Sequence, residues 1–427
     1  MKILFKNARI LKMTEEPIFV GDVIVENNKI KYVGPSKKHD EKFDREIDCE
    51  KNLLMPGFKN AHAHSAMSFL RSHADDLSLH DWLFNCVFPY EALLTEEDVY
   101  WLSQLSFLEY LTSGITAAFD QYYFPKSIAK AAEDFGMREL LLFTQSETSK
   151  ISREDLGNLY EQNSEDSLVN YCFGFHAEYT VDPTELETIA EFVHKYKAPF
   201  YTHLAETAQE VSECKERRDG MTPAEFIDSK GLWDYGGGAY HCCYMTKHDM
   251  QIFKDRDLTV VSCPGSNAKL ASGIAEIETM RKMSIEMALG TDGPASNNAL
   301  DMFREMFLVA GLQKLTCKDP VATPAREILK MATIGSAHAM NLKNSDILEE
   351  GKFADIIMID LNRPNMQPIN DIANNLVFSG SKENVKMTMI NGKILYENGE
   401  FHTKYSTKTI YDKVTEIANR IFSTVVK

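Results

Sequence analysis

The stretch LLMPGFKNAHAHSAM, residues 53–67, places two histidines one residue apart, directly after an apolar run and a Pro-Gly step. In an extended strand alternate side chains share a face, so His62 and His64 point one way while Ala61 and Ala63 point the other. Two imidazoles this close repel each other once protonated, and a bound divalent metal keeps both neutral. Taken alone, the pair fits a metal site and a surface strand with two solvated histidines equally well.

The run that carries this pair is the first of eight short strand-like runs, which alternate with longer helical patterns from about residue 53 to residue 344. The runs are LLMPGFKNAH, GITAAFD, MRELLLF, YCFGFHAE, PFYTHLAE, GGAYHCC, LTVVSCP and IEMALGTD. Parallel strands with intervening helices in this number and length are expected to close into a (β/α)8 barrel. The sequence therefore predicts an α/β fold built on a TIM-type barrel.

The sequences before and after this region have a different pattern, because they consist of short apolar segments broken by polar turns. Such segments are typical of small antiparallel strands. They include ILFKNARIL, GDVIVEN, KIKYVG and LLMPG near one end, and GKFADIIMID and VKMTMINGKILYENGEF, with its Asn391-Gly392 turn, near the other. We predict a composite small β domain, of sandwich type, from residues 1–55 and 345–405, a barrel over 56–344, and a helix in 406–427 packed on the outside.

The composition indicates which classes of binding partner are suited to the protein. The 427 residues carry 46 basic and 63 acidic side chains, for a net charge of −17, and no dense Lys/Arg block occurs. Nucleic acid and anionic membranes are therefore poor candidate partners, and a small molecule is the better one. With no apolar run of membrane-spanning length and no signal-peptide pattern in KILFKNARIL, we expect a cytoplasmic protein whose eight cysteines are free thiols. A homo-oligomer is compatible with the sequence.

Histidines gather at the predicted strand ends, which is where barrels carry their catalytic residues. His62 and His64 lie on the first strand, His176 on the fourth, His203 on the fifth and His241 on the sixth, and the eighth run ends in Asp292. Convergence of metal-type side chains from separate strands on one rim favours the metal interpretation of the opening pair.

Three of these histidines and one carboxylate, from His62, His64, His203 and Asp292, form an N3O set suited to Zn²⁺ with one position left for water. Such a metal lowers the pKa of the bound water to about 7, which provides hydroxide at neutral pH. Glu206, three residues past His203, is placed to shuttle a proton, although a glutamate at a helix N-terminus is also favoured by the macrodipole alone. His241 is a candidate contact to the hydroxide or a buried histidine bonded to backbone, and Asp292 is a candidate proton relay.

Other chemistries fit less well. No H-E-x-x-H occurs, which excludes the zincin arrangement. His176-Ala177-Glu178 matches the H-x-E half of the cytidine-deaminase signature, but no P-C-x-x-C follows it. The glycines at 236–238 precede a predicted strand rather than follow one, so they are not a dinucleotide fingerprint.

Five motifs together, PGFKNAHAH, THLAET, the histidine after GGGAY, SCPGSNAKLASG and GTDGPASNNALDMFREM, resemble the amidohydrolase superfamily. Within it the chain is most similar to the 5-methylthioadenosine/S-adenosylhomocysteine deaminases and their chlorohydrolase relatives, over nearly its whole length. The resemblance implies a metal on His62, His64, His203 and Asp292, with Glu206 and His241 catalytic. Binuclear relatives carry a bridging lysine at the third or fourth strand end, where this chain has LLLFTQ and GFHAEY, so one metal is expected.

The resemblance also implies substrate contacts. Glu91 matches the family's ribose-binding glutamate, which follows a W-L-F segment that here begins at Trp82, and His176 matches its purine-contacting histidine. Glu178 stands where the family usually has proline. Where members active on S-adenosylhomocysteine carry arginines, this chain has Thr144, Gln145, Ser146 and Glu147, with Lys150 and Arg153 nearby.

Together these features predict hydrolytic deamination of adenine nucleosides, such as 5′-methylthioadenosine, adenosine and 5′-deoxyadenosine, to the inosine analogue and ammonia. Hydroxide on the metal would attack C6, Glu206 would protonate N1, and ammonia would leave with help from Asp292 and His241. The absence of the arginines places S-adenosylhomocysteine in question. An alternative is an aminohydrolase or chlorohydrolase acting on guanine, a pyrimidine or an s-triazine, and a scaffold that has lost its chemistry is a third. Glu91 discriminates against bare bases, which have no ribose diol, and the retained polar set argues against a scaffold.

Overall fold

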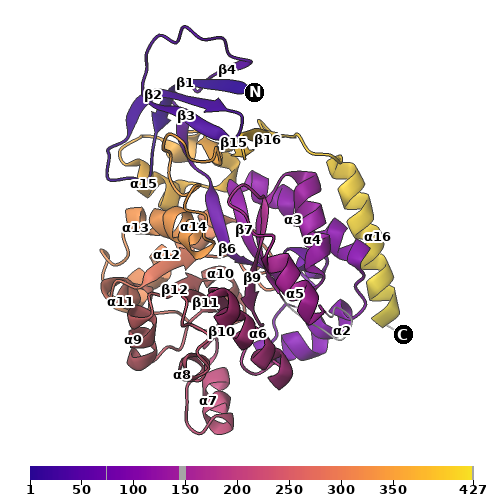
Figure 1. The fold of residues 1–427 in the computed structure, drawn as a ribbon. Helices are drawn as coiled ribbons and strands as arrows, with labels where there is room; N and C mark the ends of the chain where they lie inside the picture. Colours follow the sequence, from indigo (N-terminus) through magenta and orange to yellow (C-terminus); the bar gives the residue numbers. More distant parts are fainter. Residues whose placement is uncertain (74, 144–150, 426–427) are drawn as a thin grey trace.

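The computed structural model describes residues 1–73, 75–143 and 151–425, and it contains two β-sheets (Figure 1). The eight-stranded sheet has the order β13-β12-β11-β10-β9-β8-β7-β6, and all its neighbouring strands are parallel. Its strands are β6 (Phe58–Ala63), β7 (Ile115–Tyr122), β8 (Arg138–Phe143), β9 (Val169–Gly174), β10 (Phe200–Leu204), β11 (Gly237–His241), β12 (Thr259–Ser262) and β13 (Glu286–Leu289). Each corresponds to one predicted run, in chain order.

The first and last strands of this sheet meet and close a barrel. A parallel bridge joins Ala63 at the end of β6 to Asp292 just after β13, and the Asp292 amide donates a 3.0 Å hydrogen bond to the His62 carbonyl. Aromatic rings fill the interior, where Phe119 contacts Tyr201 and Tyr240 edge to face. The predicted (β/α)8 barrel is confirmed.

Helices surround the barrel strands (Figure 1). They are α1 (Leu79–Asp81), α2 (Phe88–Glu91), α3 (Glu96–Thr112), α4 (Pro125–Phe135), α5 (Arg153–Tyr160), α6 (Pro183–Tyr196), α7 (Ala208–Arg217), α8 (Pro223–Ser229), α9 (Lys247–Asp255), α10 (Pro264–Lys269), α11 (Ile277–Lys282), α12 (Met302–Cys317), α13 (Ala325–Lys330), α14 (Ser336–Ala339), α15 (Ile372–Asn374) and α16 (Thr407–Val425). Shorter 3-10 or π-helical segments are η1 (Ser65–Leu70), η2 (Trp82–Val87), η3 (Met331–Gly335), η4 (Pro364–Met366), η5 (Asn375–Ser379) and η6 (Lys382–Asn384).

Local sequence fixes where several of these helices begin. Helices α3, α8 and α9 each start with a threonine whose hydroxyl accepts from the amide three residues on, while the acidic side chain at that position accepts from the threonine amide. This reciprocal capping box satisfies two amides that have no partner within the helix. The pairs are Thr95 with Asp98, Thr222 with Glu225, and Thr246 with Asp249.

The second sheet combines strands from both ends of the chain. Its order is β17-β16-β15-β14-β5-β1-β2-β3, with β4 paired to β1. The strands are β1 (Lys2–Ile10), β2 (Phe19–Glu26), β3 (Lys29–Pro35), β4 (Arg45–Asp48), β5 (Leu53–Pro56), β14 (Ile356–Ile359), β15 (Val385–Ile390), β16 (Lys393–Glu397) and β17 (Glu400–Phe401). The sheet is mixed rather than wholly antiparallel, because β4 and β5 run parallel to β1. A tight hairpin forces the two strands that it joins to be antiparallel. β1 is not joined to β4 or β5 by such a hairpin, so these pairs can be parallel. The domain boundaries stay a prediction.

The run LLMPGFKNAH, predicted as the first barrel strand, contains two strands, and the assignment of LLMPG to the small β domain is the one that the strand pairing supports. Its first half is β5, which pairs with β1 and β14, and its second half is β6, which pairs with β7 in the barrel. The chain passes between the sheets at Gly57, where a Cβ atom would lie 2.1 Å from Cγ2 of Thr116. Glycine is therefore required for this close crossing.

A buried ion pair joins the two sheets. Nε of Arg138, on β8 of the barrel, lies 2.8 Å from Oδ2 of Asp355, which precedes β14 of the other sheet. Both side chains are almost completely shielded from solvent. Asp355 also accepts hydrogen bonds from Ser345 and from the amide of Asn391, so it links three segments of the chain.

The C-terminal helix α16 lies along the outside of the barrel, against α3 (Figure 1). It buries Ile410, Val414, Ile417 and Ile421 on one face, and Arg420 forms an ion pair with Asp98 at the start of α3. Among the described residues, no helix is both long enough and apolar enough to cross a membrane.

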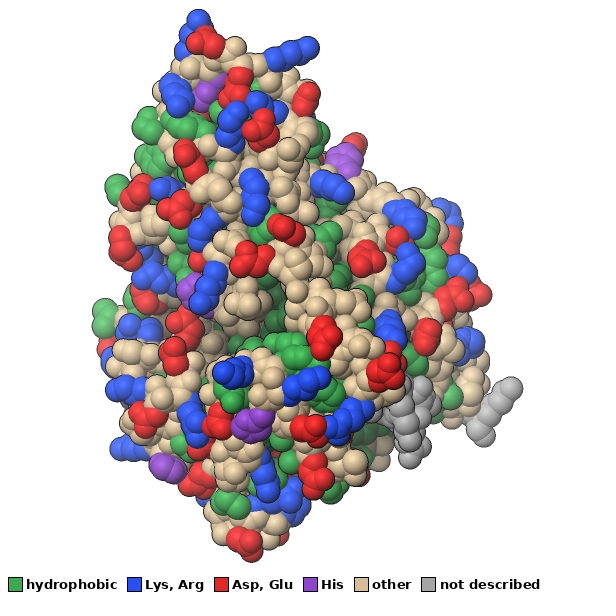
Figure 2. Space-filling model, viewed as in Figure 1, with side chains coloured by type: hydrophobic (Ala, Val, Ile, Leu, Met, Phe, Trp, Pro, Cys, Tyr) green, Lys and Arg blue, Asp and Glu red, His purple; other side chains and the backbone are tan. Residues whose placement is uncertain are grey.

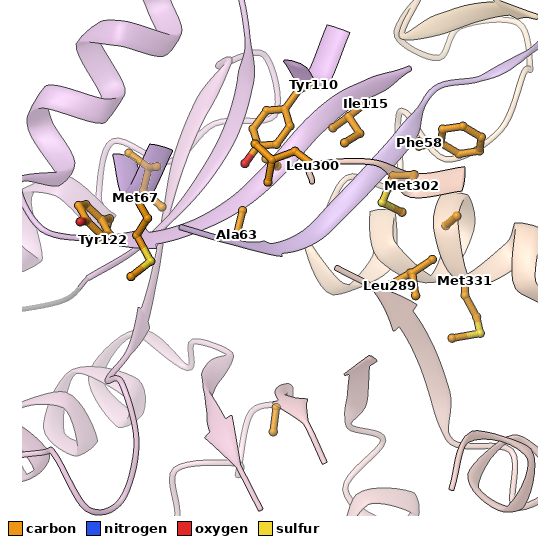
Figure 3. Packing of buried hydrophobic residues seen from close by; sticks show 14 of the residues in the cluster. Phe58, Ala63, Met67, Tyr110, Ile115, Tyr122, Leu289, Leu300, Met302 and Met331 are labelled. Atoms are coloured by element: carbon orange, nitrogen blue, oxygen red, sulfur yellow. The ribbon is translucent and has the colours of Figure 1, made fainter. Parts of the chain in front are cut away.

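Buried apolar side chains also pack between the barrel strands and the helices around them. Figure 3 shows Phe58 and Leu289 from the barrel near Met302 at the start of α12 and Met331 at the start of η3. The outer surface is charged, and on the face seen in Figure 2 acidic and basic side chains are interspersed.

Candidate active site

The carboxyl ends of barrel strands β6, β10 and β11 and the segment after β13 bring the predicted polar residues together at one rim. His62 lies on β6, His203 on β10 and His241 at the end of β11, while Asp292 follows β13. His241 and Asp292 both adopt a positive φ, of 69° and 60°, which is uncommon for residues other than glycine. Such backbone strain persists only where surrounding contacts maintain it, and it clusters at functional sites.

Four buried donor atoms, from His62, His203, His241 and Asp292, lie within 4.8 Å of one another. The Nε2 atoms of His62 and His203 are 3.1 Å apart, and Oδ1 of Asp292 lies 3.5 Å from Nε2 of His62. Two nitrogen ligands about 2.0–2.1 Å from one Zn²⁺ stand roughly 3 Å apart, so this spacing fits a shared metal. The described residues therefore form a centre able to hold one divalent ion.

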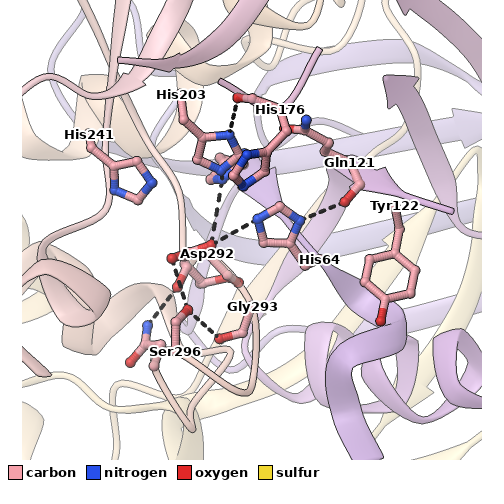
Figure 4. Close-up of polar contacts among 12 residues, drawn as sticks. His64, Gln121, Tyr122, His176, His203, His241, Asp292, Gly293 and Ser296 are labelled. Carbon is pink, nitrogen blue, oxygen red and sulfur yellow. Dashed lines mark hydrogen bonds and ion pairs between the residues drawn. The ribbon is translucent and has the colours of Figure 1, made fainter. Parts of the chain in front are cut away.

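His64 lies beside this cluster. Its Nε2 is 3.2 Å from Oδ1 of Asp292, and its Nδ1–H donates a 2.6 Å hydrogen bond to the Gln121 carbonyl (Figure 4). Nδ1 of His203 is held in the same way by the His176 carbonyl, at 2.8 Å. With their Nδ1 protons committed to carbonyls, both rings direct Nε2 toward the centre, which is the usual arrangement of metal-binding histidines. Burial opposes protonation of His64, but the neighbouring Asp292 carboxylate outweighs it and raises the pKa of His64 to about 9, so this ring has to release its Nε2 proton when a metal binds.

The electrostatics of the centre also fit a cation. Burial lowers the pKa of His62 to about 3 and holds the pKa of His203 well below its ordinary value, so both rings are neutral and able to ligate. Burial alone would raise the pKa of Asp292, but its bonds to His62 and His64 hold it well below the usual range. Ser296 donates a further hydrogen bond of 2.8 Å to Oδ2 of Asp292 (Figure 4).

His241 differs from the other histidines in the bond made by its second nitrogen. The side-chain amide of Asn267 lies 2.9 Å from Nδ1 of His241 and donates to it, which places the ring proton on Nε2. That Nε2 lies 3.7 Å from Oε2 of Glu206. In this tautomer His241 presents a donor rather than a lone pair, so the arrangement favours His64 over His241 as a ligand.

Glu206 is buried, and desolvation raises the pKa of its carboxyl group. Its Oε1 accepts a 2.8 Å hydrogen bond from Ser272, which leaves Oε2 on the side of His241. A carboxylate that is partly destabilised by burial, beside a metal centre, is suited to accept and return a proton.

The same centre opens into an inner cavity that contains the predicted substrate contacts. Its lining includes Glu91, Trp82 and His176 together with His64, His203, Glu206, His241 and Asp292. Burial raises the pKa of Glu91 to about 7, although Tyr122 donates a 2.5 Å hydrogen bond to its Oε1. Nδ1 of His176 lies 2.9 Å from Oγ1 of Thr180.

An outer cavity of about 750 Å³ adjoins the inner one, and both are lined by Leu79, Leu83, Tyr179 and Leu270. Among the described residues, two basic side chains line this outer cavity, those of Arg217 and Lys269. Each is already paired, Arg217 with Glu178 at 2.7 Å and Lys269 with Asp75 at 2.6 Å.

The structure explains Glu178, which stands where the family resemblance leads us to expect proline. Its buried carboxylate accepts from Arg217 at 2.7 Å and from Arg218 at 2.6 Å, and these guanidinium groups lower its pKa although burial opposes them. Arg153, on α5, pairs instead with Glu191 and lines neither cavity. The predictions for Thr144, Gln145, Ser146, Glu147 and Lys150 lie outside the described residues.

Several residues at the site were not predicted from the sequence. Asn267 and Ser272 lie within the motif SCPGSNAKLASG, but nothing in that motif shows which side chains they contact. Tyr122 ends β7 with no pattern of its own, and Glu210 has the spacing of an ordinary helix cap. Asn267, Ser272 and Tyr122 have partners on distant segments, and Glu210 bonds the turn just before its helix, so only the fold reveals these contacts.

Comparison with known proteins identifies the family of the chain. The amidohydrolase family model matches residues 53–395. The chain belongs to the amidohydrolase family. Among other members, a 5-methylthioadenosine/S-adenosylhomocysteine deaminase of Caldanaerobacter subterraneus subsp. tengcongensis is 37% identical and is matched over 99% of each chain.

Solved amidohydrolase-type structures share the architecture. An adenosine deaminase of Xanthomonas campestris, determined with bound zinc, has a TM-score of 0.92 and 29% identity, with 99% of this chain and 98% of that chain covered. A zinc-bound atrazine chlorohydrolase of Arthrobacter aurescens has a TM-score of 0.88 over 97% of this chain and 100% of its own. Its identity is 21%, so this second likeness supports the fold alone.

Proposed function

We propose that the chain is a metal-dependent aminohydrolase that converts adenine nucleosides and water to the inosine analogue and ammonia. The candidate substrates are 5′-methylthioadenosine, adenosine and 5′-deoxyadenosine, with S-adenosylhomocysteine a further candidate. One observation carries the proposal: the buried carboxylate of Glu91 lines the same cavity as the metal donors and Glu206. A purine at the centre and a ribose diol at Glu91 would occupy one continuous site.

The proposed ligands are His62, His64, His203 and Asp292, for one divalent metal, and the zinc bound in the similar adenosine deaminase makes Zn²⁺ the first candidate. A metal held by these residues lowers the pKa of a bound water to about 7. Glu206 is then the group that takes a proton from the attacking water and delivers it to N1 of the purine. The oxygen adds to C6 as the C6=N1 double bond opens and N1 takes the proton, and the bond from C6 to the amino nitrogen then breaks as the C6=O bond forms.

The remaining residues orient the reactants. His241, with its proton on Nε2, is placed to donate a hydrogen bond to the oxygen that adds to C6. Asp292 is the proposed acceptor of the second water proton, which the departing ammonia needs. Trp82 and His176 line the cavity at positions suited to contact the purine.

The names of the relatives support the same substrate class, because the similar proteins are a 5-methylthioadenosine/S-adenosylhomocysteine deaminase and an adenosine deaminase. Hydrolysis of guanine, a pyrimidine or an s-triazine is disfavoured, since those molecules give Glu91 no diol to bind. We further propose a cytoplasmic location and a small-molecule substrate as the functional partner.

Ammonia release from a panel of compounds tests this function. Purified protein supplied with Zn²⁺ is expected to act on adenosine and 5′-methylthioadenosine, and His203→Ala, which removes a proposed ligand, is expected to be inactive. Activity confined to guanine, cytosine or a chloro-s-triazine would contradict the proposal, as would equal activity of the His203→Ala variant.

A further inference from the structure

The turn that carries Glu206 is held by a second buried glutamate. Strand β10 ends at Leu204, and the chain then turns through Ala205, whose φ is +49°, before α7 begins after Thr207. The carboxylate of Glu210 reaches back across this turn. Its Oε1 accepts from the Ala205 amide at 2.7 Å, and its Oε2 accepts from the Glu206 amide at 2.8 Å.

This contact is not the ordinary helix cap that its sequence spacing predicts. In the capping boxes of α3, α8 and α9 the acidic side chain bonds the amide of the capping threonine itself. Glu210 occupies the equivalent position of α7, and its amide donates to Thr207, yet its carboxylate bonds the two amides before Thr207. The carboxylate is thus used to hold the turn rather than to begin the helix.

The side chain of Glu206 is held from a different part of the chain. Ser272 follows α10, and its hydroxyl donates a 2.8 Å hydrogen bond to Oε1 of Glu206. Ser272 is itself buried. The backbone of Glu206 is therefore fixed by Glu210, and one carboxylate oxygen is fixed by Ser272, so that Oε2 is left facing His241 at 3.7 Å.

We propose that Glu210 and Ser272 are positioning residues that orient Glu206 for proton transfer. This inference rests on the proposed function, because it assigns the orientation of the group that would carry the proton. A positive φ at Ala205 makes the turn costly without an external constraint. Small misplacements of a catalytic group lower the rate strongly, and about 1 Å can cost ~100-fold.

Substitutions that change the side chain as little as possible provide a test of the proposal. Glu210→Gln retains one acceptor but turns an NH2 group toward the second amide, so two donors face each other. We expect Glu210→Gln and Ser272→Ala each to lower kcat by at least ~10-fold with little change in KM or metal content. The matched control is Glu225→Gln, the same change in the capping box of α8, which should leave kcat unchanged.

Double variants separate positioning from general destabilisation. If both residues act through Glu206, neither substitution should lower kcat further in a Glu206→Gln background. Full activity of Glu210→Gln and Ser272→Ala in an active wild-type enzyme would overturn the inference, and so would fully additive losses in the double variants.

Hydrogen exchange gives a readout that does not require turnover. The amides of Ala205 and Glu206 should exchange faster in Glu210→Gln than in the wild type, while the Thr222 amide should be unaffected. Unchanged exchange at Ala205 and Glu206 would refute the holding role. A wild-type protein that releases no ammonia from any nucleoside would refute the proposed function instead, and the exchange result would still decide whether Glu210 holds the turn.

Discussion

The Tyr122 hydroxyl donates a 2.5 Å hydrogen bond to Oε1 of Glu91 inside the cavity that also contains the metal donors. Tyr122 ends β7 and Glu91 ends α2, so a barrel strand orients a carboxylate carried by the helical segment over the site. The bond fixes the direction in which Glu91 can accept hydrogen bonds from a ligand. The proposed ribose contact at Glu91 would therefore be oriented by the rim of the barrel.

Removal of the Glu91 carboxylate should abolish the preference for substrates that carry both ribose hydroxyls. Adenosine is expected to be a much better substrate than 2′-deoxyadenosine or adenine, because an unpaired buried carboxylate is costly. Glu91→Ala should reduce the ratio of kcat/KM between adenosine and 2′-deoxyadenosine by about 10-fold or more, the scale of one charged hydrogen bond. Glu185→Ala, outside both described cavities, is the control. An unchanged ratio in Glu91→Ala would remove Glu91 from sugar recognition.

Glu206→Gln should separate proton transfer from metal binding. The amide cannot accept and return a proton, so turnover should fall by at least ~100-fold, while the metal content and the melting temperature stay close to those of the wild type. Steady-state kinetics and elemental analysis of the same preparation make the comparison. Near-normal turnover would assign Glu206 to helix stabilisation alone.

The metal content should be one ion per chain. This follows from the single cluster of donors in the described residues and from the lack of a lysine at the ends of β8 and β9. Removal of the ion with a chelator should abolish turnover and lower the melting temperature, because a ligand that binds only the folded state stabilises it. Elemental analysis that finds no transition metal, or two per chain, would contradict this expectation.

Neutral 5′ groups should be preferred over the amino acid of S-adenosylhomocysteine. The cations that line the outer cavity in the described residues, Arg217 and Lys269, are engaged with Glu178 and Asp75. A substrate carboxylate would have to compete with those pairs, which costs affinity. The check compares kcat/KM for 5′-methylthioadenosine, adenosine, 5′-deoxyadenosine and S-adenosylhomocysteine. The last compound as the best substrate would show that another cation reaches the site.

Asp355→Asn should weaken the connection between the two sheets. It leaves Arg138 buried without its counter-ion, which is expected to lower the free energy of unfolding by about 3–5 kcal/mol. Asp412→Asn, which removes an exposed pair on α16, should change the free energy by less than about 1 kcal/mol. Equal melting temperatures of the wild type and Asp355→Asn would count against the buried pair.

The same pair gives a pH dependence with a defined sign. Burial favours the protonated form of Asp355, but the charges of Arg138 and Lys59 outweigh it and lower its pKa in the folded protein. A carboxyl group whose pKa is lowered by folding stabilises the protein above its ordinary pKa and loses that effect as the pH falls. The difference between the wild type and Asp355→Asn should therefore be constant near neutrality and narrow below about pH 4.

The sequence was sufficient to predict the barrel, because each strand run is separated from the next by a helical pattern. It supported two overlapping interpretations near Gly57, because LLMPG fits both the small β domain and the first barrel strand, and only the strand pairing separates them. Periodicity cannot distinguish such a run from one long strand. The parallel pairing of β1 with β4 and β5 was likewise hidden, since register between distant strands depends on the assembled sheet.

The predicted site residues converge because strand-end position is readable from sequence in a barrel. Their orientation is not readable, since it depends on contacts between distant segments. Asn267 sets the tautomer of His241 from helix α10, and Glu178 is neutralised by Arg217 and Arg218, about 40 residues further along the chain. Glu210 shows that a local contact can also be missed, because its spacing fits a capping box while its carboxylate bonds the amides of Ala205 and Glu206.

The pairing of β5 with β14 has a consequence for biosynthesis. The two strands are separated by about 300 residues, so β5 leaves the ribosome long before its partner exists. During that interval β5 presents an unpaired edge with apolar side chains, which is the feature that promotes association with other chains. The small sheet is thus completed only after the barrel has been translated, and β5 has one edge without its partner until then.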